Sequence, residues 1–468
     1  MKYPCGFGHV INDRQTLSTP TKAHIAVVSL EGLSTPKTTE RARFGKANAK
    51  HPWTSHRYMK KDVTPSFIII IIIINLSLSL SLSPFERAAE PLPLSRLCLP
   101  KFRLQNENPD HVFIQFFRKK AAKSGRTRQK KKERTHHHAM EAVREKLQGA
   151  ELSEAATKAF LHNYGKLEGG ESGLIPEHDI EAVSTLPSLV ELQQSGDDGD
   201  GVVDGDGSAT TRELLSKTIV LKLNGGLGTS MGLEKAKSLL KVKAGRTFLD
   251  LIADQISSLS SGVQFVLMNS FSTHEDTIEA LRQSRPEIAN QEDLVLIQSK
   301  SPKIDATTME PVSHPKNPDL EWCPPGHGDI YPSLLGTGML DRLLDKGFKY
   351  AFVSNSDNLG AVLSTDLLGH FASSGSAFMM EVAERTEADK KGGHLCRRKE
   401  DNQLILRESA MCPEEDKSKF QDKSTHRYFN TNNLWLDLAQ LKHKMDECGG
   451  MLPLPLIKNK KTVDPRDR

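Results

Sequence analysis

The chain has 468 residues, of which 37% are hydrophobic and 26% are charged. This composition excludes a polytopic membrane protein and a chain that is disordered from end to end, and the length allows two or three domains. Six cysteines without a CxxC pair exclude a disulfide scaffold and favour a reducing compartment. The net charge of +4 hides an asymmetry, because residues 1–139 contain 25 Lys and Arg against 9 Asp and Glu.

These first 139 residues show neither a helical nor a strand period. They include seven consecutive isoleucines, Ile68–Ile74. The uncharged stretch Ser66–Phe85 is about long enough to span a bilayer, and the basic run Arg118–Arg134 is typical of a nuclear signal or a nucleic-acid-binding arm. We favour a third interpretation, in which 1–139 is a translated leader before a start at Met140, and expect a disordered extension without chemistry.

The remainder of the chain has the pattern of folded protein. We expect a helix over Met140–Tyr164 and an acidic Gly-rich linker over Ser195–Ser208, so that 140–213 form a helical segment with a linker. From residue 214 onward, strand and helix patterns alternate. Strands are expected at 218–223, 263–269, 294–298, 350–354 and 377–383, and helices at 248–259, 273–283, 339–346 and 365–373. This alternation predicts a doubly wound, mostly parallel α/β sheet that binds ligands at the carboxyl ends of its strands.

The first of these strands runs into a glycine-rich loop, LNGGLGTSMG, at residues 223–232. Its four glycines let the backbone approach a ligand closely and direct N–H groups toward it, which suits phosphate. The loop matches neither the Walker A nor the GxGxxG pattern, and a plain glycine turn is the alternative. Lys235, Lys237 and Lys241 follow the loop and favour a polyphosphate ligand.

Four further motifs are rich in polar residues. In EWCPPGHGD, over 321–329, His327 stands between glycines and can donate to a phosphate or a hydroxyl, or simply belong to a turn. In SNSDNLG, over 354–360, Asp357 follows a strand, where a lone carboxylate suits Mg²⁺ or an N-cap. The segments KKGGH, over 390–394, and FNTNNLW, over 429–435, fit either turns or sugar hydroxyl binding. Together, the motifs predict a nucleotidyl transfer by direct in-line displacement.

In this order, the motifs LNGGLGTSMG, WCPPGHGD, SNSDNLG, KGG and FNTNNLW resemble those of the UTP–glucose-1-phosphate uridylyltransferases, or UDP-glucose pyrophosphorylases. The resemblance covers about residues 140–468. It implies a Rossmann-like nucleotidyltransferase fold with a mixed, mostly parallel sheet, a catalytic domain at 214–468 and Mg²⁺ as cofactor. The implied reaction is the reversible conversion of UTP and glucose 1-phosphate into UDP-glucose and pyrophosphate.

The resemblance also implies roles for individual residues. Lys237, His327 and Asp357 would be catalytic, with Asp357 as the metal ligand. The nucleotide would contact Leu223, Asn224, Gly225, Gly226, Lys237, Met268, Gln298, Gly326 and Asn355, and the sugar would contact His327, Gly393, Glu408 and Asn430. Cytoplasm is the implied location, with a plastid as the alternative if the extension is translated. Neither nucleic acid nor a membrane is expected as a partner, and the oligomeric state is left open.

Two departures from the family pattern bear on these expectations. Many members have Gly-Pro where this chain has Lys235-Ala236. The family also continues with a further lysine for the UTP phosphates and a β-helix domain, and we expect this chain to lack both, as a C-terminally truncated member. Two alternatives stay open: an enzyme of the same fold for another hexose 1-phosphate, and an inactive paralogue that binds nucleotide without turnover, which the missing lysine favours.

Overall fold

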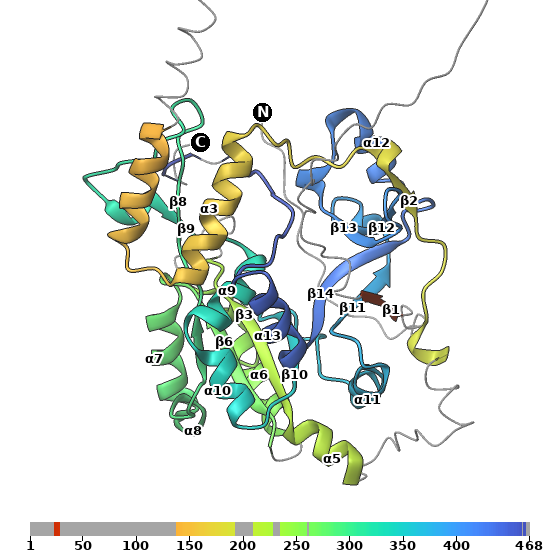
Figure 1. Cartoon of the computed structure of the whole chain (residues 1–468). Coiled ribbons are helices and arrows are strands. Elements are labelled where there is room, and N and C mark those ends of the chain that lie inside the picture. Colours follow the sequence, from red (N-terminus) through yellow and green to blue (C-terminus); the bar gives the residue numbers. More distant parts are fainter. Residues whose placement is uncertain are drawn as a thin grey trace, which may run out of the picture. The chain divides into compact units, whose positions relative to one another are not determined.

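The computed structural model describes the backbone of residues 23–28 and residues 137–191, 209–227, 235–259, 262–460 and 462–464 (Figure 1). The stretches Ser66–Phe85 and Arg118–Arg134 and the linker Ser195–Ser208 lie outside the described residues. Within the N-terminal extension, Ala23–Val28 form the strand β1. No helix in the described part has both the length and the apolar character that crossing a membrane requires.

The described residues are built around one ten-stranded mixed sheet. Its main path has the order β1-β11-β14-β10-β3-β6-β7, and β12, β13 and β2 join it beside β14. Strands β10, β3, β6 and β7 are parallel to one another, whereas β14 is antiparallel to both β10 and β11. The strands are β2 (Ile180–Ala182), β3 (Thr218–Asn224), β6 (Gln264–Asn269), β7 (Val295–Ile297), β10 (Tyr350–Asn355), β11 (Phe378–Glu384), β12 (His394–Arg398), β13 (Leu404–Arg407) and β14 (Tyr428–Asp437). The mixed, mostly parallel sheet is thereby confirmed.

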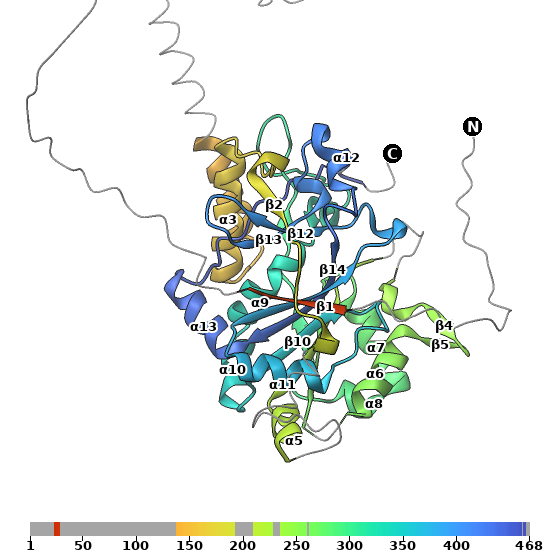
Figure 2. The same cartoon turned by 90° about the vertical axis from the view of Figure 1, so that its right-hand side faces the viewer.

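Helices cover both faces of this sheet, as Figures 1 and 2 show. Along β3, Ile219 and Leu221 pack in one core cluster with α9, α10 and α13, while Val220 packs on the opposite face with α5 and α11. Helices α6, α7 and α8 pack against Phe265 and Leu267 of β6. The helices are α3 (Glu154–Glu168), α5 (Ala209–Ser216), α6 (Phe248–Ser257), α7 (His274–Ser284), α8 (Pro286–Ala289), α9 (Ile330–Gly336), α10 (Met339–Asp345), α11 (Thr365–Ser374), α12 (Lys417–Phe420) and α13 (Leu438–Glu447). Because β3 is buried on both faces, its sequence TIVLKLN is nearly continuous in apolar residues rather than alternating.

The predicted strands and helices of the alternating region are present, with ends shifted by at most two residues. The single helix predicted over Met140–Tyr164 is wrong. The chain forms one helix over 137–148 and then α3, and a turn at Gly149–Glu151 separates the two. Glu151 has a φ of 53°, and the Ser153 side chain caps α3 by accepting a hydrogen bond from the Ala156 N–H. The left-handed conformation of Glu151 ends the first helix, and the Ser153 cap begins α3.

The asparagine-rich motif FNTNNLW is also not a turn, because it lies within β14 in the interior of the sheet.

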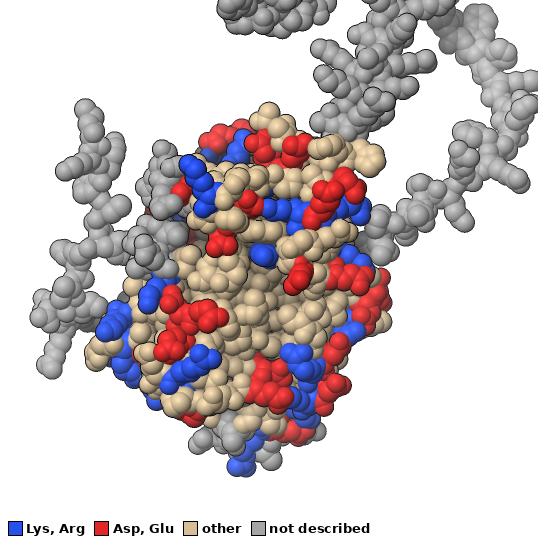
Figure 3. Space-filling view, turned by 90° about the vertical axis from the view of Figure 1, so that its left-hand side faces the viewer, with Lys and Arg blue, Asp and Glu red and all other residues tan. Residues whose placement is uncertain are grey.

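Two short two-stranded ribbons complete the fold. They pair β4 (Lys241–Lys243) with β5 (Arg246–Thr247), and β8 (Ser301–Pro302) with β9 (Trp322–Cys323). On the face shown in Figure 3, positive and negative side chains are interspersed around an uncharged area, so that face presents no continuous basic surface.

Candidate active site

The candidate site lies where β3, β6 and β10 end at the same edge of the sheet. Leu223 stands in register between Asn355 of β10 and Met268 of β6. Parallel strands bring their carboxyl ends together, and ligands of doubly wound sheets bind there. Met268 is only 2% exposed and packs in the core, which leaves little of its side chain open to a ligand.

Asn224, at the end of β3, anchors the start of the glycine-rich loop. Its Nδ2 donates to Asn269 Oδ1 at 2.8 Å and to Thr277 Oγ1 at 3.0 Å, and its Oδ1 accepts from Ser356 Oγ at 3.1 Å. The side chain is buried and its hydrogen-bonding groups are occupied, so Asn224 holds the loop in place between β6, α7 and the segment after β10. Asn269, Thr277 and Ser356 were not predicted as site residues.

Gly225 and Gln298 are in close contact. A Cβ atom at Gly225 would lie 2.5 Å from Gln298 Oε1, so only glycine allows Gln298 to occupy this position. Gln298 Nε2 is buried and has no hydrogen-bond partner among the described residues. Buried polar atoms normally find a partner, so this amide offers a donor to a ligand beside the loop. The next glycine, Gly226, accepts a hydrogen bond at 3.4 Å from the Lys237 N–H, and residues 228–234 lie outside the described part.

Lys237 and Asp357 form an ion pair at the same edge. The Lys237 Nζ lies 3.3 Å from Asp357 Oδ2, and the two side chains are 37% and 38% exposed. A pair as exposed as this contributes little to stability, so both groups can exchange partners when a charged ligand arrives. Among the described residues there is no cluster of three or more His, Cys, Asp or Glu that could hold a metal. Mg²⁺ needs no such cluster, because it usually binds through one or two carboxylates while substrate phosphates and water complete its shell.

Asn432 connects Asn355, at the end of β10, to His327 and was not among the predicted site residues. Its Nδ2 donates to Asn355 Oδ1 at 2.8 Å and lies 3.1 Å from His327 Nδ1. The register of β14 against β11 shifts here, so Thr431 and Asn432 form a bulge, and Asn432 has a φ of 58°. Bulges next to active sites redirect a side chain. The only sequence signal was the cluster of asparagines, a residue type that tolerates this conformation.

His327 begins the short 3₁₀ helix His327–Asp329 and follows Gly326 directly. Although His327 is exposed as a whole residue, loss of water around the imidazole lowers its pKa, and the nearby carboxylates of Glu408 and Asp357 act in the opposite direction. A neutral ring whose Nδ1 accepts from Asn432 carries its proton on Nε2. His327 can therefore donate one hydrogen bond toward a ligand.

Gly393, Glu408 and Asn430 form a second group of neighbouring residues. The Asn430 N–H donates to the Gly393 carbonyl at 3.1 Å, and Asn430 Nδ2 lies 3.4 Å from Glu408 Oε1. A Cβ atom at Gly393 would lie 2.6 Å from Glu408 Cδ. Asn430 Oδ1 accepts from the Asn432 N–H at 2.8 Å. This contact links the group to His327 and Asn355 through Asn432, so contacts run from the glycine-rich loop to Gly393.

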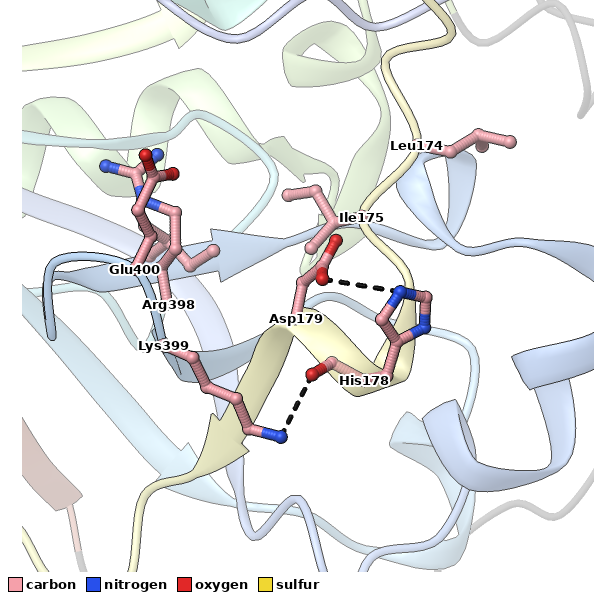
Figure 4. A pocket seen from close by; sticks show the side chains of 8 residues that line it. Leu174, Ile175, His178, Asp179, Arg398, Lys399 and Glu400 are labelled. Carbon is pink, nitrogen blue, oxygen red and sulfur yellow. Dashed lines mark hydrogen bonds and ion pairs between the residues drawn. The ribbon is translucent and has the colours of Figure 1, made fainter. Parts of the chain in front are cut away.

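The pocket shown in Figure 4 is separate from this site. It has a volume of about 300 Å³ and lies between the residues before β2 and the β12–β13 hairpin. His178 Nε2 lies 3.4 Å from Asp179 Oδ1, and the Lys399 amine donates to the His178 carbonyl at 2.9 Å. None of the predicted site residues lines it.

The fold and the site together indicate a class of protein. A doubly wound sheet with a glycine-rich loop, a lysine and a lone carboxylate at its carboxyl edge is typical of Rossmann-like nucleotide-binding proteins. The family model of UTP–glucose-1-phosphate uridylyltransferase matches residues 197–468, and the chain belongs to this family.

Individual relatives agree with this assignment. The UTP–glucose-1-phosphate uridylyltransferase of Solanum tuberosum is 41% identical over 324 residues, which are 67% of this chain and 64% of that protein. That of Encephalitozoon cuniculi is 42% identical over 54% of this chain and 50% of its own length. The chain thus spans between half and about two thirds of the length of these curated relatives.

Solved structures show the same fold. The UDP-glucose pyrophosphorylase of Leishmania major, known in open and closed structures, has a TM-score of 0.64 and 42% identity, covering 70% of this chain and 69% of that one. The Trypanosoma brucei protein has a TM-score of 0.63 and 43% identity, covering 70% and 68%. A variant of the Leishmania protein has been solved in complex with UDP-glucose.

Proposed function

We propose that the chain catalyses the reversible, Mg²⁺-dependent transfer of a uridylyl group from UTP to glucose 1-phosphate, giving UDP-glucose and pyrophosphate. Family membership supports this reaction. The observation that carries it is the hydrogen-bonded series Asn355–Asn432–Asn430–Glu408, which connects the phosphate end of the site to a group suited to sugar hydroxyls.

The nucleotide end of the proposed site is the glycine-rich loop. Gly225 and Gly226 would bring backbone against the nucleotide, and Leu223 and Met268 would form the floor beneath the uracil ring. Gln298 would give its unpartnered Nε2 donor to a uracil carbonyl. This contact would separate uracil from cytosine, which has an amino group where uracil has one of its carbonyls.

The phosphates would lie between Lys237 and Asp357. Asp357 would hold Mg²⁺, with Asn355 beside it, and the ion would neutralise charge on the phosphates. Lys237 would exchange Asp357 for a phosphate oxygen, which their exposed ion pair permits. Gly326 would lie against the nucleotide, and the Nε2–H of His327 would donate to the phosphate of the sugar.

The sugar would be recognised by Gly393, Glu408 and Asn430. A carboxylate and an amide within 3.4 Å of each other offer adjacent acceptors and donors, as vicinal hydroxyls require. A phosphate oxygen of glucose 1-phosphate would attack the α-phosphorus of UTP while the bond to the β-phosphate breaks. Pyrophosphate leaves with its charge balanced by Lys237, and the reaction needs no covalent intermediate on the protein.

The location we propose is the cytoplasm. None of the cysteines in the described part, Cys323, Cys396, Cys412 and Cys448, is in a disulfide. Free thiols fit a reducing compartment.

The test is an assay of pyrophosphate release by the full chain with UTP, glucose 1-phosphate and Mg²⁺. Asp357→Asn removes the metal-binding charge and is expected to lower kcat by about 100-fold, as for loss of one transition-state contact. Asp345→Asn, at an exposed carboxylate ending α10, is the matched control and should retain full activity.

Substrate analogues distinguish the alternatives. A higher kcat/KM with galactose 1-phosphate or N-acetylglucosamine 1-phosphate than with glucose 1-phosphate would assign another sugar. Binding of UTP by calorimetry without any product would contradict the proposed reaction and identify a nucleotide-binding protein without turnover.

A further inference from the structure

A buried lysine lies directly behind the loop that carries Asp357. Lys222 is in β3 and is 2% exposed, so it does not reach the ligand-facing edge of the site. Its Nζ donates to Ser354 Oγ at 2.8 Å and to the Ala361 carbonyl at 2.7 Å. It also lies 5.8 Å from the centre of the Phe352 ring.

The two acceptors of Lys222 are the two ends of one loop. Ser354 precedes Asn355, the last residue of β10, and Ala361 follows the turn at 356–360 that contains Asp357. One ammonium group therefore joins the start of the loop to its end. Within the described part of the chain, hydrogen bonds and an ion pair from Leu223, Asn224, Lys237, Gln255 and Asn432 also attach the loop to neighbouring elements.

Packing alone does not account for a charge at this position. Burial lowers the pKa of Lys222 to about 8, which reflects the loss of hydration around the ammonium. The carboxylate that offsets it, Glu381 of β11, accepts from Trp435 Nε1 at 2.8 Å and from Asn433 Nδ2 at 3.0 Å rather than from Lys222 itself. An apolar side chain of similar length would fill the space without desolvating a charge.

We propose that Lys222 is a positioning residue, which holds the loop 355–360 so that Asp357 faces the metal and the phosphates. The inference rests on the role of Asp357 in the proposed function and extends it to a residue that touches neither substrate nor metal. Replacing Lys222 with methionine would leave the Ser354 hydroxyl and the Ala361 carbonyl without their donor.

The first test needs no substrate. Hydrogen exchange of the full chain carrying Lys222→Met is expected to be about tenfold faster at the amides of 355–361, while exchange in α7 stays unchanged. The control is Lys217→Met, just before β3, at a lysine whose side chain is 44% exposed and pairs with Glu213. Unchanged exchange in the loop, or an equal increase throughout the domain, would overturn the proposal.

The second test uses Mn²⁺ as the probe. Electron paramagnetic resonance in the presence of UTP should show about tenfold weaker Mn²⁺ binding for Lys222→Met than for the control, as for loss of a supporting contact behind a metal ligand. Equal Mn²⁺ affinities would count against the positioning role.

Ser354→Ala keeps the proposal testable if Lys222→Met does not fold. This variant removes one of the two acceptors and keeps the charge, so it should raise exchange of the same amides to a smaller extent. If both variants fold, their effects should be less than additive, because they remove the same contact. Wild-type chain that releases no pyrophosphate would refute the proposed reaction alone, whereas an unaltered loop in both variants would refute the role of Lys222.

Discussion

At the scale of single residues, the site depends on glycines that leave room for a neighbouring side chain. Gly225 accommodates Gln298, and Gly393 accommodates Glu408. In both pairs the partner is a polar residue with a proposed ligand contact. A methyl group at either glycine would displace the partner without removing any functional group, which makes these positions sensitive probes of the site.

Gly393→Ala is predicted to weaken sugar binding selectively. The new methyl group would push Glu408 away and lengthen its 3.4 Å contact with Asn430. The KM for glucose 1-phosphate should rise by about tenfold, as for loss of one hydrogen bond, while the KM for UTP changes little. Steady-state kinetics with each substrate varied in turn measure both values.

Gly165→Ala is the control for that measurement. Gly165 lies in α3, where an added Cβ atom meets nothing within 4 Å, so alanine should be neutral or slightly stabilising. For Gly393→Ala, a rise in the KM for UTP equal to the rise in the KM for glucose 1-phosphate would contradict the prediction that Gly393 supports only the sugar end of the site.

At the scale of elements, the connection between β11 and β12 is organised by one arginine. Arg385 is buried, and its guanidinium donates to the carbonyls of Lys390 at 2.7 Å and of Gly392 at 3.2 Å. It also donates to the Phe420 carbonyl at 2.7 Å, which ties the connection to α12. Gly393 follows this segment directly, so its position depends on a side chain that does not itself face the site.

Arg385→Met is predicted to loosen this connection. The carbonyls would lose their donor, and the KM for glucose 1-phosphate should rise by about tenfold with an unchanged dissociation constant for UTP. Arg385→Lys keeps one donor group, so its KM for glucose 1-phosphate should lie between those of the wild type and of Arg385→Met. Kinetics and calorimetry check both values, and an equal loss of affinity for both ligands would instead indicate general unfolding.

At the scale of the whole molecule, a buried polar cluster couples stability to pH. His394 and His426 stack with their ring centres 3.8 Å apart, and His426 Nε2 lies 2.9 Å from Glu177 Oε1. Arg407 is fully buried beside them and also contacts Glu177. Burial, followed by the charge of His426, lowers the pKa of His394 to about 2, and burial also lowers the pKa of His426.

The direction of the pH dependence follows from these pKa values. In the unfolded chain both histidines take up protons near their ordinary pKa of about 6.5, whereas in the folded chain they stay neutral to lower pH. The unfolded state therefore binds more protons, and stability falls as the pH drops below about 6.5. Asp329 opposes this trend, because burial raises its pKa to about 6.

His394→Leu is predicted to flatten this dependence. The variant should lose less stability than the wild type between pH 7 and pH 5, by about 2 kcal/mol for one histidine. Denaturant unfolding at both pH values measures the difference. His443→Gln, at a side chain that is 77% exposed, is the control and should follow the wild type.

Much of the fold and of the site was predictable because the signals are local. The alternation of strand and helix patterns is a property of neighbouring residues, and it placed the strands β3, β6, β7, β10 and β11 correctly. The break between 148 and α3 was missed, since the apolar period continues across a turn that Glu151 and Ser153 create. The functional roles of Lys237, His327, Asp357 and the other predicted site residues stay predictions.

The sequence by itself determined the class of fold, the family and the motifs that reach the carboxyl edge of the sheet. Only the tertiary structure decided which residues meet there. The bulge that turns Asn432 toward His327, the closeness of Gln298 to Gly225 and the position of Lys222 behind Asp357 join residues that are 73 to 135 positions apart. Periodicity and motif spacing are properties of residues that are close in sequence. Contacts between distant residues depend instead on strand register and packing, which no local pattern specifies.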